Sequence, residues 1–140
     1  MGFLTGKTAI ITGGGRAVLS DGSCGSIGYG IATAYAKEGA NLVLTGRNVK
    51  KLEDAKKELE RLYGVKVLAV QADVNAGADN KAAVEHVVKQ AVEEFGRIDV
   101  LINNAQASAS GVTLADHTTE QFDLAIYSGL YATFYYMQAC

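Results

Sequence analysis

The sequence predicts an α/β fold in which a doubly wound parallel sheet is covered by helices on both faces. Two observations predict it. Short apolar runs alternate with helical patterns along the chain, and none of the 140 residues is proline. Continuous apolar strands are typical of parallel sheets that are buried on both faces. Because crossovers between parallel strands are right-handed, we expect the strand order 3-2-1-4 in a sheet that this part of the chain leaves incomplete.

Four short apolar runs are the candidates for the strands. The first is rich in β-branched residues and is followed at once by glycines, as is typical of a buried strand that ends in a turn. In chain order, the four runs are 8–12 (TAIIT), 41–45 (NLVLT), 66–72 (KVLAVQA) and 99–105 (DVLINNA).

Two helices are expected between the first three strands. The first should end at Gly39, and its apolar residues recur every four positions, at Ile27, Ile31 and Tyr35. The second should begin after Asn48, a suitable N-cap, and end at Gly64. Its apolar stripe consists of Leu52, Ala55, Leu59 and Leu62.

The third and fourth helices have longer apolar stripes. The third, which Gly96 should end, carries Val84, Val87, Val88, Ala91, Val92 and Phe95. A capping box from Thr118 to Gln121 opens the fourth. One side of it carries Phe122, Ile126, Leu130 and Phe134, and a second stripe carries Tyr127, Tyr131 and Tyr135. A helix that is apolar around most of its girth should be covered on two sides, by further chain, by a partner subunit, or by both.

Composition excludes several classes of function. Apolar residues make up 49% of the chain, and the net charge of −2 provides no field that would attract nucleic acid or an anionic membrane. No apolar run approaches the roughly 18 residues of a membrane span. Cys24 and Cys140 lie apart from each other and from His86 and His117, so we expect free thiols, no metal site and a cytoplasmic location.

A glycine-rich loop, ITGGGRAVLSDGSCGSIGYGIA, lies between the first strand and the first helix. At this place free backbone N–H groups and a helix dipole attract a pyrophosphate, although a plain surface turn would have the same composition. The segment GFLTGKT does not predict a P-loop, because Gly2 and Gly6 are separated by three residues instead of four and the segment precedes the strand.

Polar residues follow the other three strands. Arg47 stands after the second strand, where an acidic residue would bind the hydroxyls of a ribose, and an arginine suits a ribose 2′-phosphate. Asp73 follows the third strand and Asn103 to Ala105 follow the fourth. Each alone is consistent with turn chemistry, but ligands of open α/β sheets bind at this edge.

These segments together resemble the short-chain dehydrogenase/reductase family, whose domain is of Rossmann type. The residues that carry the resemblance are ITGGG…SIGYGIA, LVLTGRN, ADV, GRIDVLINNA and FDLAIYSGLYATF. Within the family, SIGYGIATAYAKEGANLVLTGRN, LINNAQASASG and IYSGLYATFYYM resemble the NADP-dependent 12α-hydroxysteroid dehydrogenases that act on bile acids. The resemblance implies that residues 1–140 are the N-terminal, dinucleotide-binding part of one such domain.

The resemblance assigns cofactor contacts to individual residues. Against the family's T-G-x-x-x-G-I-G loop, residues 17–25 are an insertion of nine residues. Gly13, Ile27 and Gly28 would approach the pyrophosphate, with Ser26 at the middle-glycine position and Arg16 as a further phosphate contact. Arg47 and Asn48 would meet the 2′-phosphate, and Asp73 and Val74 would flank the adenine. Asn103 and Ala105 would lie along the nicotinamide ribose, next to Gln106, which replaces a glycine of the family.

The resemblance assigns no catalytic residue. The family uses a serine and a Tyr-x-x-x-Lys helix, in which lysine lowers the tyrosine pKa for proton transfer. No tyrosine here has lysine four residues on, and the helix asparagine of the family's proton relay falls on Gly129. We therefore expect these 140 residues to be inactive alone.

The function that the resemblance implies is an NADP(H)-dependent hydride transfer between the nicotinamide and a secondary alcohol or ketone of a hydroxysteroid. We also expect a homo-oligomer formed through the helix from Thr119 to Cys140. Two alternatives stay open: an enoyl-thioester reductase, which SIGYGIA also resembles, and a non-catalytic NADP-binding module.

Overall fold

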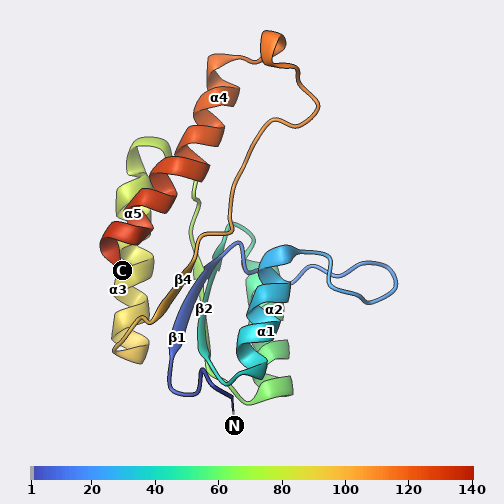
Figure 1. Ribbon diagram of the computed structural model, residues 1–140, viewed down its shortest axis with the longest axis vertical. Helices are drawn as coiled ribbons and strands as arrows, with labels where there is room; N and C mark the ends of the chain where they lie inside the picture. The colour runs from blue at the N-terminus through green and yellow to red at the C-terminus, as the bar shows by residue number, and fades with distance from the viewer. Residues whose placement is uncertain (1) are drawn as a thin grey trace.

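A four-stranded parallel sheet lies at the centre of the computed structural model, which describes residues 2–140 (Figure 1). The strand order is β3-β2-β1-β4, which confirms the prediction. The strands are β1 (Thr8–Thr12), β2 (Asn41–Gly46), β3 (Val67–Gln71) and β4 (Val100–Ile102). Since all three pairings are parallel, the carboxyl ends of the strands meet at one edge of the sheet.

Two layers of helices cover the sheet. The helices are α1 (Ile27–Lys37), α2 (Val49–Tyr63), α3 (Asn80–Phe95), α4 (Thr119–Ile126) and α5 (Ala132–Ala139). Short 3₁₀ turns, Gly77–Asp79 and Leu114–Asp116, precede α3 and α4. A π-helical turn, Tyr127–Tyr131, joins α4 to α5.

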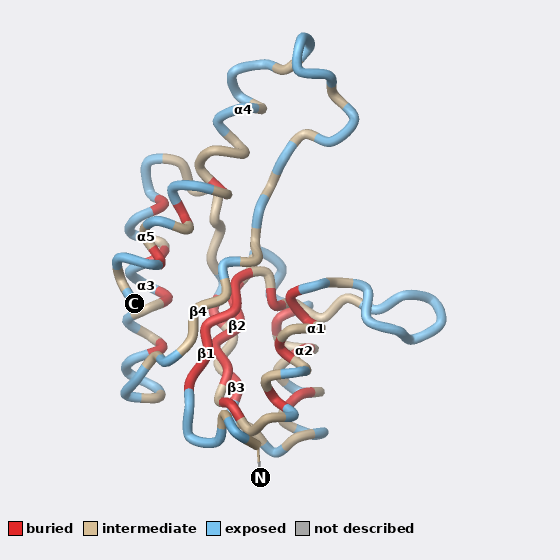
Figure 2. Tube along the Cα trace, in the orientation of Figure 1, coloured by how far each residue is buried: buried red, intermediate tan, exposed pale blue. Residues whose placement is uncertain are grey.

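Alternating residues of the strands face the two layers. Ala9 and Ile11 pack with α1 and α2, whereas Ile10 packs with α3 and α5. These side chains are all inaccessible to solvent, and Figure 2 shows the buried residues gathered along β1 and β2 and the helix sides that face them. The central strands are buried on both faces, which is why their sequences read as continuous apolar runs.

The ends of the helices lie where the capping residues predict them. The side chain of Asn48 accepts a hydrogen bond from the backbone N–H of Lys51 at 3.0 Å. Gly64 and Gly96 end α2 and α3 in the left-handed conformation, with φ of 66° and 73°. Thr118 and Gln121 form the predicted capping box of α4.

The predicted stripe of the first helix is right for Ile31 and Tyr35, which are partly buried against the core, and wrong for Ile27. Ile27 is 77% exposed, and the buried residues of α1 are Gly28, Tyr29, Ala32 and Ala36. Glycine and alanine let the helix backbone lie close to the sheet, so three of the four buried residues of this helix are small and only Tyr29 is large. Leu62 of α2 and Val92 of α3 also belong to predicted apolar stripes, but their side chains are about half exposed.

The predicted apolar stripe of the last helix is largely exposed in the part of the chain that the structure describes. Phe122, Leu130 and Phe134 are 58%, 62% and 50% exposed. The π-helical turn holds an extra residue, which changes the face that the following turns present to the sheet. The buried residues are instead Ser128, Ala132 and Tyr136. The tyrosine stripe does form, with the rings of Tyr127 and Tyr131 stacked at 5.2 Å.

The insertion at residues 17–25 forms a hairpin that projects from the body of the molecule before α1 begins (Figure 1). Val18 and Cys24 make an antiparallel bridge, and the N–H of Gly25 donates to the carbonyl of Ala17 at 2.7 Å. At the tip, the carboxylate of Asp21 accepts from the N–H of Ser23 at 2.9 Å.

Candidate functional site

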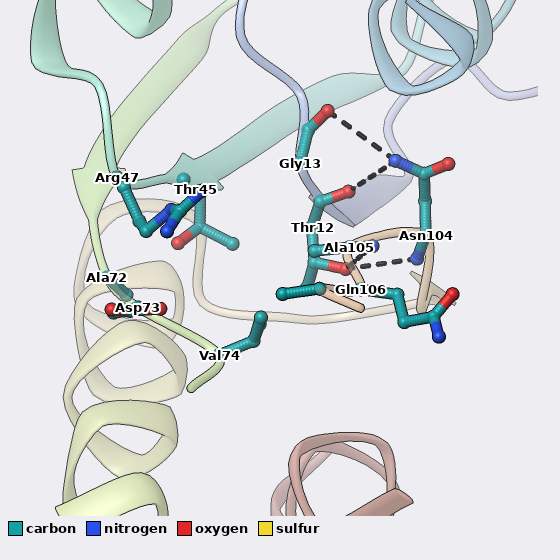
Figure 3. Close-up of a pocket in the computed structure, with 12 residues that line it drawn as sticks. Thr12, Gly13, Thr45, Arg47, Ala72, Asp73, Val74, Asn104, Ala105 and Gln106 are labelled. Atoms are coloured by element: carbon teal, nitrogen blue, oxygen red, sulfur yellow. Dashed lines mark hydrogen bonds between the residues drawn. The ribbon is translucent and has the colours of Figure 1, made fainter. Parts of the chain in front are cut away.

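A cavity of about 270 Å³ opens at the carboxyl edge of the sheet (Figure 3). It lies where β1 and β4 lead into their loops and where the segments after β2 and β3 turn away. Its lining residues are Thr12, Gly13, Thr45, Gly46, Arg47, Ala72, Asp73, Val74, Asn104, Ala105, Gln106 and Ala107. In Figure 3, Arg47 and Asp73 lie at one end, and Asn104 and Gln106 at the other.

The ends of β1 and β4 are locked together beneath this cavity. The hydroxyl oxygen of Thr12 accepts hydrogen bonds from the N–H groups of Asn104, at 3.0 Å, and Ala105, at 2.9 Å. The amide nitrogen of the Asn104 side chain donates to the carbonyl of Thr12 at 3.0 Å. Because Thr12 is buried, these bonds fix the loop after β4 against the glycine loop.

The glycine loop passes too close to α1 for side chains. Gly13 has φ of 68°, and a Cβ on Gly28 would lie 2.0 Å from the carbonyl oxygen of Gly13. Ser26, the N-cap of α1, does not cap it, and its hydroxyl donates instead to the carbonyl of Gly15 at 3.4 Å. The N–H groups of the first helical turn therefore keep their capacity to bind an anion.

A second cavity, of about 260 Å³, lies on the other side of Arg47. Its lining residues are Gly13, Gly15, Ala17, Ser26, Gly46, Arg47, Asn48, Lys51 and Leu52. Arg47 and Lys51 form no ion pair with any residue among 2–140. The N-cap residue of α1 and two cations thus line the same space, which makes it suited to phosphate.

Asp73 shapes the wall opposite. One of its carboxylate oxygens accepts from the N–H of Asn75 at 2.9 Å, which turns the chain after β3. Val74 follows directly and presents an apolar surface to the cavity.

Arg16 lines neither of these two cavities. Its Nε lies 2.9 Å from a carboxylate oxygen of Glu58, and the hydroxyl of Tyr29 donates to the same carboxylate at 3.0 Å. Desolvation lowers the pKa of the Arg16 guanidinium, but the contacts with Tyr29 and Glu58 outweigh it and raise that pKa. The cluster fastens the base of the hairpin to α1 and α2.

The predicted site residues fall into three groups. The main cavity is lined by Gly13, Arg47, Asp73, Val74, Ala105 and Gln106. The second cavity adds Ser26 and Asn48. Neither cavity is lined by Arg16, Ile27, Gly28 or Asn103.

Sequence reasoning missed several lining residues. Asn104 lines the cavity and Asn103 is exposed, a choice that two adjacent asparagines do not reveal. Lys51 stands one helical turn after the N-cap of α2, and that spacing is the signal that would have placed it near the carboxyl edge. The remaining missed residues are Thr12, Thr45, Gly46, Ala72 and Ala107 of the main cavity and Gly15, Ala17 and Leu52 of the second.

Among the described residues, no tyrosine lines either cavity, so no tyrosine is placed there to act as a general acid. Tyr136, packed under the sheet, is 1% exposed, and burial raises its pKa to about 12. Among residues 2–140, no group of three His, Cys, Asp or Glu side chains is placed to hold a metal ion, and none of the helices has the length and apolarity to cross a bilayer.

A parallel sheet of this order, flanked by helices and with a glycine loop at its carboxyl edge, defines a fold of Rossmann type. Residues 7–140 match the sequence profile of the short chain dehydrogenases. The chain belongs to the short-chain dehydrogenase family.

Individual relatives agree with this assignment. The 12alpha-hydroxysteroid dehydrogenase of Clostridium sp. is 64% identical over all 140 residues, which cover 51% of that protein. The structure of L-sorbose reductase from Gluconobacter frateurii, complexed with NADPH and L-sorbose, matches with a TM-score of 0.83 and 31% identity over 97% of this chain and 46% of its own. An alcohol dehydrogenase from Thermococcus sibiricus, complexed with 5-hydroxy-NADP, gives a TM-score of 0.81 and 32% identity over 95% of this chain and 51% of its own. The chain spans about half the length of the relatives it matches.

Proposed function

We propose that this chain is the NADP(H)-binding part of a short-chain dehydrogenase that oxidises a hydroxysteroid or reduces the corresponding ketone. The observation that carries the proposal is the pairing of a cavity at the carboxyl edge of the sheet with Arg47 at the end of β2, where an NAD-binding site would have a carboxylate. The 64% identity to a 12alpha-hydroxysteroid dehydrogenase supports the steroid as substrate.

The residues fit the cofactor at each of its charged parts. The first turn of α1, with Gly13, Ser26, Ile27 and Gly28, would hold the pyrophosphate through backbone N–H groups. Arg47, Asn48 and Lys51 would hold the 2′-phosphate, since Arg47 and Lys51 are free of carboxylate partners among the described residues. This set replaces the predicted phosphate contact of Arg16, which the carboxylate of Glu58 already engages.

The uncharged parts would lie across the main cavity. Asp73 and Val74 would flank the adenine at one end. Ala105, Gln106 and the segment from Asn103 would lie along the nicotinamide ribose at the other, held by the contacts of Asn104 with Thr12. When bound, the nicotinamide supplies or accepts the hydride, and these residues orient it and exclude water from one of its faces.

Proton transfer would need residues that this chain does not supply. No tyrosine has lysine four positions on, and Tyr136 holds its proton at neutral pH because its pKa is about 12. We therefore propose that the 140 residues alone bind cofactor weakly and show no turnover.

Two further assignments accompany this function. The exposed apolar side chains of the last helices would pair with a second copy of the chain, through Phe122, Leu130, Tyr131, Phe134 and Met137. Cys24 and Cys140 are both unpaired and exposed, which favours a reducing, cytoplasmic environment.

The test is an assay of the polypeptide as its source cell makes it, with NADP⁺ and a 12α-hydroxylated bile acid. We expect reduced nicotinamide to appear with the bile acid and not with NAD⁺ in place of NADP⁺. Reduction of an enoyl thioester without steroid oxidation would favour the enoyl-reductase alternative. NADPH binding without turnover on any carbonyl would favour the non-catalytic module.

A further inference from the structure

Two segments that line the main cavity are connected by hydrogen bonds to one helical turn, one of them directly and the other through the side chain of Asn80. The segment after β3 contributes Val74 to the cavity, and the segment after β4 contributes Ala107. Both are tied to the π-helical turn Tyr127–Tyr131, at Tyr127 and Ser128. Neither Ser128 nor Asn80, whose side chains make these hydrogen bonds, is among the predicted site residues.

Ser128 makes the first tie. It is completely buried, and its hydroxyl oxygen accepts a hydrogen bond from the N–H of Ala107 at 2.9 Å. The hydroxyl carries a single proton, which it donates either to the carbonyl of Leu124, at 2.7 Å, or to the carbonyl of Ala107, at 3.0 Å. Among residues 2–140, Ser128 makes the hydrogen bonds that hold residues 106–112 to another part of the chain.

Asn80 makes the second tie. It is the first residue of α3 and is completely buried. Its side-chain amide donates to the carbonyl of Val74 at 2.6 Å and to the carbonyl of Tyr127 at 3.0 Å. The wall on the Val74 side is thereby joined to the residue that directly precedes Ser128.

We propose that Ser128, together with Asn80, is a positioning residue that sets the separation of the two walls of the cofactor cavity. The inference rests on the proposed function, because the cavity is taken to be the NADP(H) site. The hydroxyl of Ser128 is hydrogen-bonded to the backbone of Ala107, which lines the cavity and belongs to a loop with few other hydrogen bonds. Loss of its hydroxyl leaves the N–H of Ala107 without a buried partner and frees the wall beside the proposed nicotinamide position.

The contrast between Ser128→Val and Ser128→Thr isolates the hydroxyl, since valine and threonine have nearly the same shape. The ligands are NADPH and 2′,5′-ADP, and calorimetric titration of the full-length protein measures both dissociation constants. We expect Ser128→Val to weaken NADPH about tenfold relative to Ser128→Thr. Binding of 2′,5′-ADP should be equal in the two variants, because that fragment would contact the Arg47 end. Asn80→Ala, which loosens the adenine side, should weaken both ligands.

Thr8→Val is the matched control. Thr8 is 1% exposed at the opposite end of β1, and its hydroxyl has no hydrogen-bond partner among the described residues, so both affinities should stay unchanged. A melting curve for each variant establishes that it is folded at the assay temperature. Should Ser128→Val not fold, the comparison of Ser128→Ala with Thr8→Ala replaces it, with the same expected loss for NADPH alone.

Equal NADPH affinity in Ser128→Val and Ser128→Thr would overturn the inference. So would an equal loss of NADPH and 2′,5′-ADP in Ser128→Val, which would indicate a general loosening of the fold. Failure of the unmodified protein to bind NADPH would instead overturn the proposed function, and the two failures are thus distinguished.

Discussion

At the scale of single residues, the proposed choice of cofactor depends on Arg47. It lines both cavities at the carboxyl edge, beside Lys51 and the uncapped end of α1. A guanidinium grips a phosphate through two parallel hydrogen bonds, and it offers nothing comparable to a ribose hydroxyl pair. A preference for a 2′-phosphorylated cofactor should therefore be sensitive to this side chain.

Arg47→Ala should weaken NADPH about 10- to 100-fold and leave NADH nearly unchanged, because only the 2′-phosphate loses a charge-assisted contact. The measurement is the pair of dissociation constants from fluorescence of the reduced nicotinamide. Arg61→Ala is the matched control, since it removes the same charge from α2 at an exposed position that lines neither cavity. Equal losses for NADPH and NADH would contradict the assignment.

Two glycines of α1 give a prediction about stability. A Cβ on Gly28 would lie 2.0 Å from the carbonyl oxygen of Gly13, so Gly28→Ala should destabilise the protein by about 1–3 kcal/mol or more and open the glycine loop. A Cβ on Gly30 meets only the Cys24 sulfur, at 3.5 Å. Gly30→Ala should therefore stabilise the helix by about 0.5–1 kcal/mol. Thermal unfolding of the two variants checks both signs, and a neutral Gly28→Ala would argue against the close contact of loop and helix.

At the scale of elements, strands and helix ends follow from the sequence better than buried faces do. The strand at 8–12 and the caps at Asn48, Gly64 and Gly96 depend on local chemistry, and all are confirmed. The buried face of α1 depends instead on how closely it approaches the sheet, and alanine and glycine decide that. The predicted stripe of large apolar residues therefore included the exposed Ile27 and left out the small residues Gly28, Ala32 and Ala36, which are buried.

The π-helical turn between α4 and α5 was not predictable for a related reason. Local propensity does not distinguish a π turn from an α turn, since both use the same residues and differ by one position in the hydrogen bonds. In this turn, the hydroxyl of Ser128 is hydrogen-bonded to Ala107 of the cavity wall, and the carbonyl of Tyr127 is hydrogen-bonded to Asn80. The sequence therefore indicated which strand ends carry the site but not which helix supports it.

Asp99, which opens β4, should make the stability of the sheet depend on pH. Its carboxylate accepts from Nε of Arg97 at 2.9 Å and from the N–H of Thr8 at 2.9 Å. The hydrogen bond from Arg97, and next the one from Thr8, lower its pKa from 3.8 to about 2. Since the folded-state pKa lies below the unfolded one, the stabilisation is full above about pH 4 and is lost as the pH falls toward 2.

Asp99→Asn should therefore lower the melting temperature at pH 7, and the difference from the unmodified protein should shrink between about pH 4 and pH 2. Melting curves recorded across this interval measure the effect. Glu94→Gln, an exposed carboxylate on α3, is the control and should change little. A difference that stays constant down to pH 2 would show that Asp99 does not act through its charge.

At the scale of the whole molecule, apolar surface is concentrated on the last helices. Leu130, Phe134 and Met137 are each at least half exposed, on a helix that stands beside α3 (Figure 2). Exposed apolar patches of this kind are sites of association.

The double substitution Leu130→Glu with Phe134→Glu should shift the protein to a smaller species, because it places charge in the proposed subunit contact. Sedimentation velocity measures the change in mass. Leu114→Glu, at a residue that is 90% exposed on a separate turn, should leave the mass unchanged. If all three proteins sediment alike, the helix face is not the subunit contact.

The most direct test of the central claim, that NADP(H) binds across the carboxyl edge of the sheet, is amide hydrogen exchange with and without NADPH. We predict slower exchange in the glycine loop, the first turn of α1, and the segments 46–48, 72–74 and 104–107. The hairpin tip at 19–23 and the C-terminal half of α2 should exchange as before. Protection outside these segments, or none at saturating NADPH, would contradict the account.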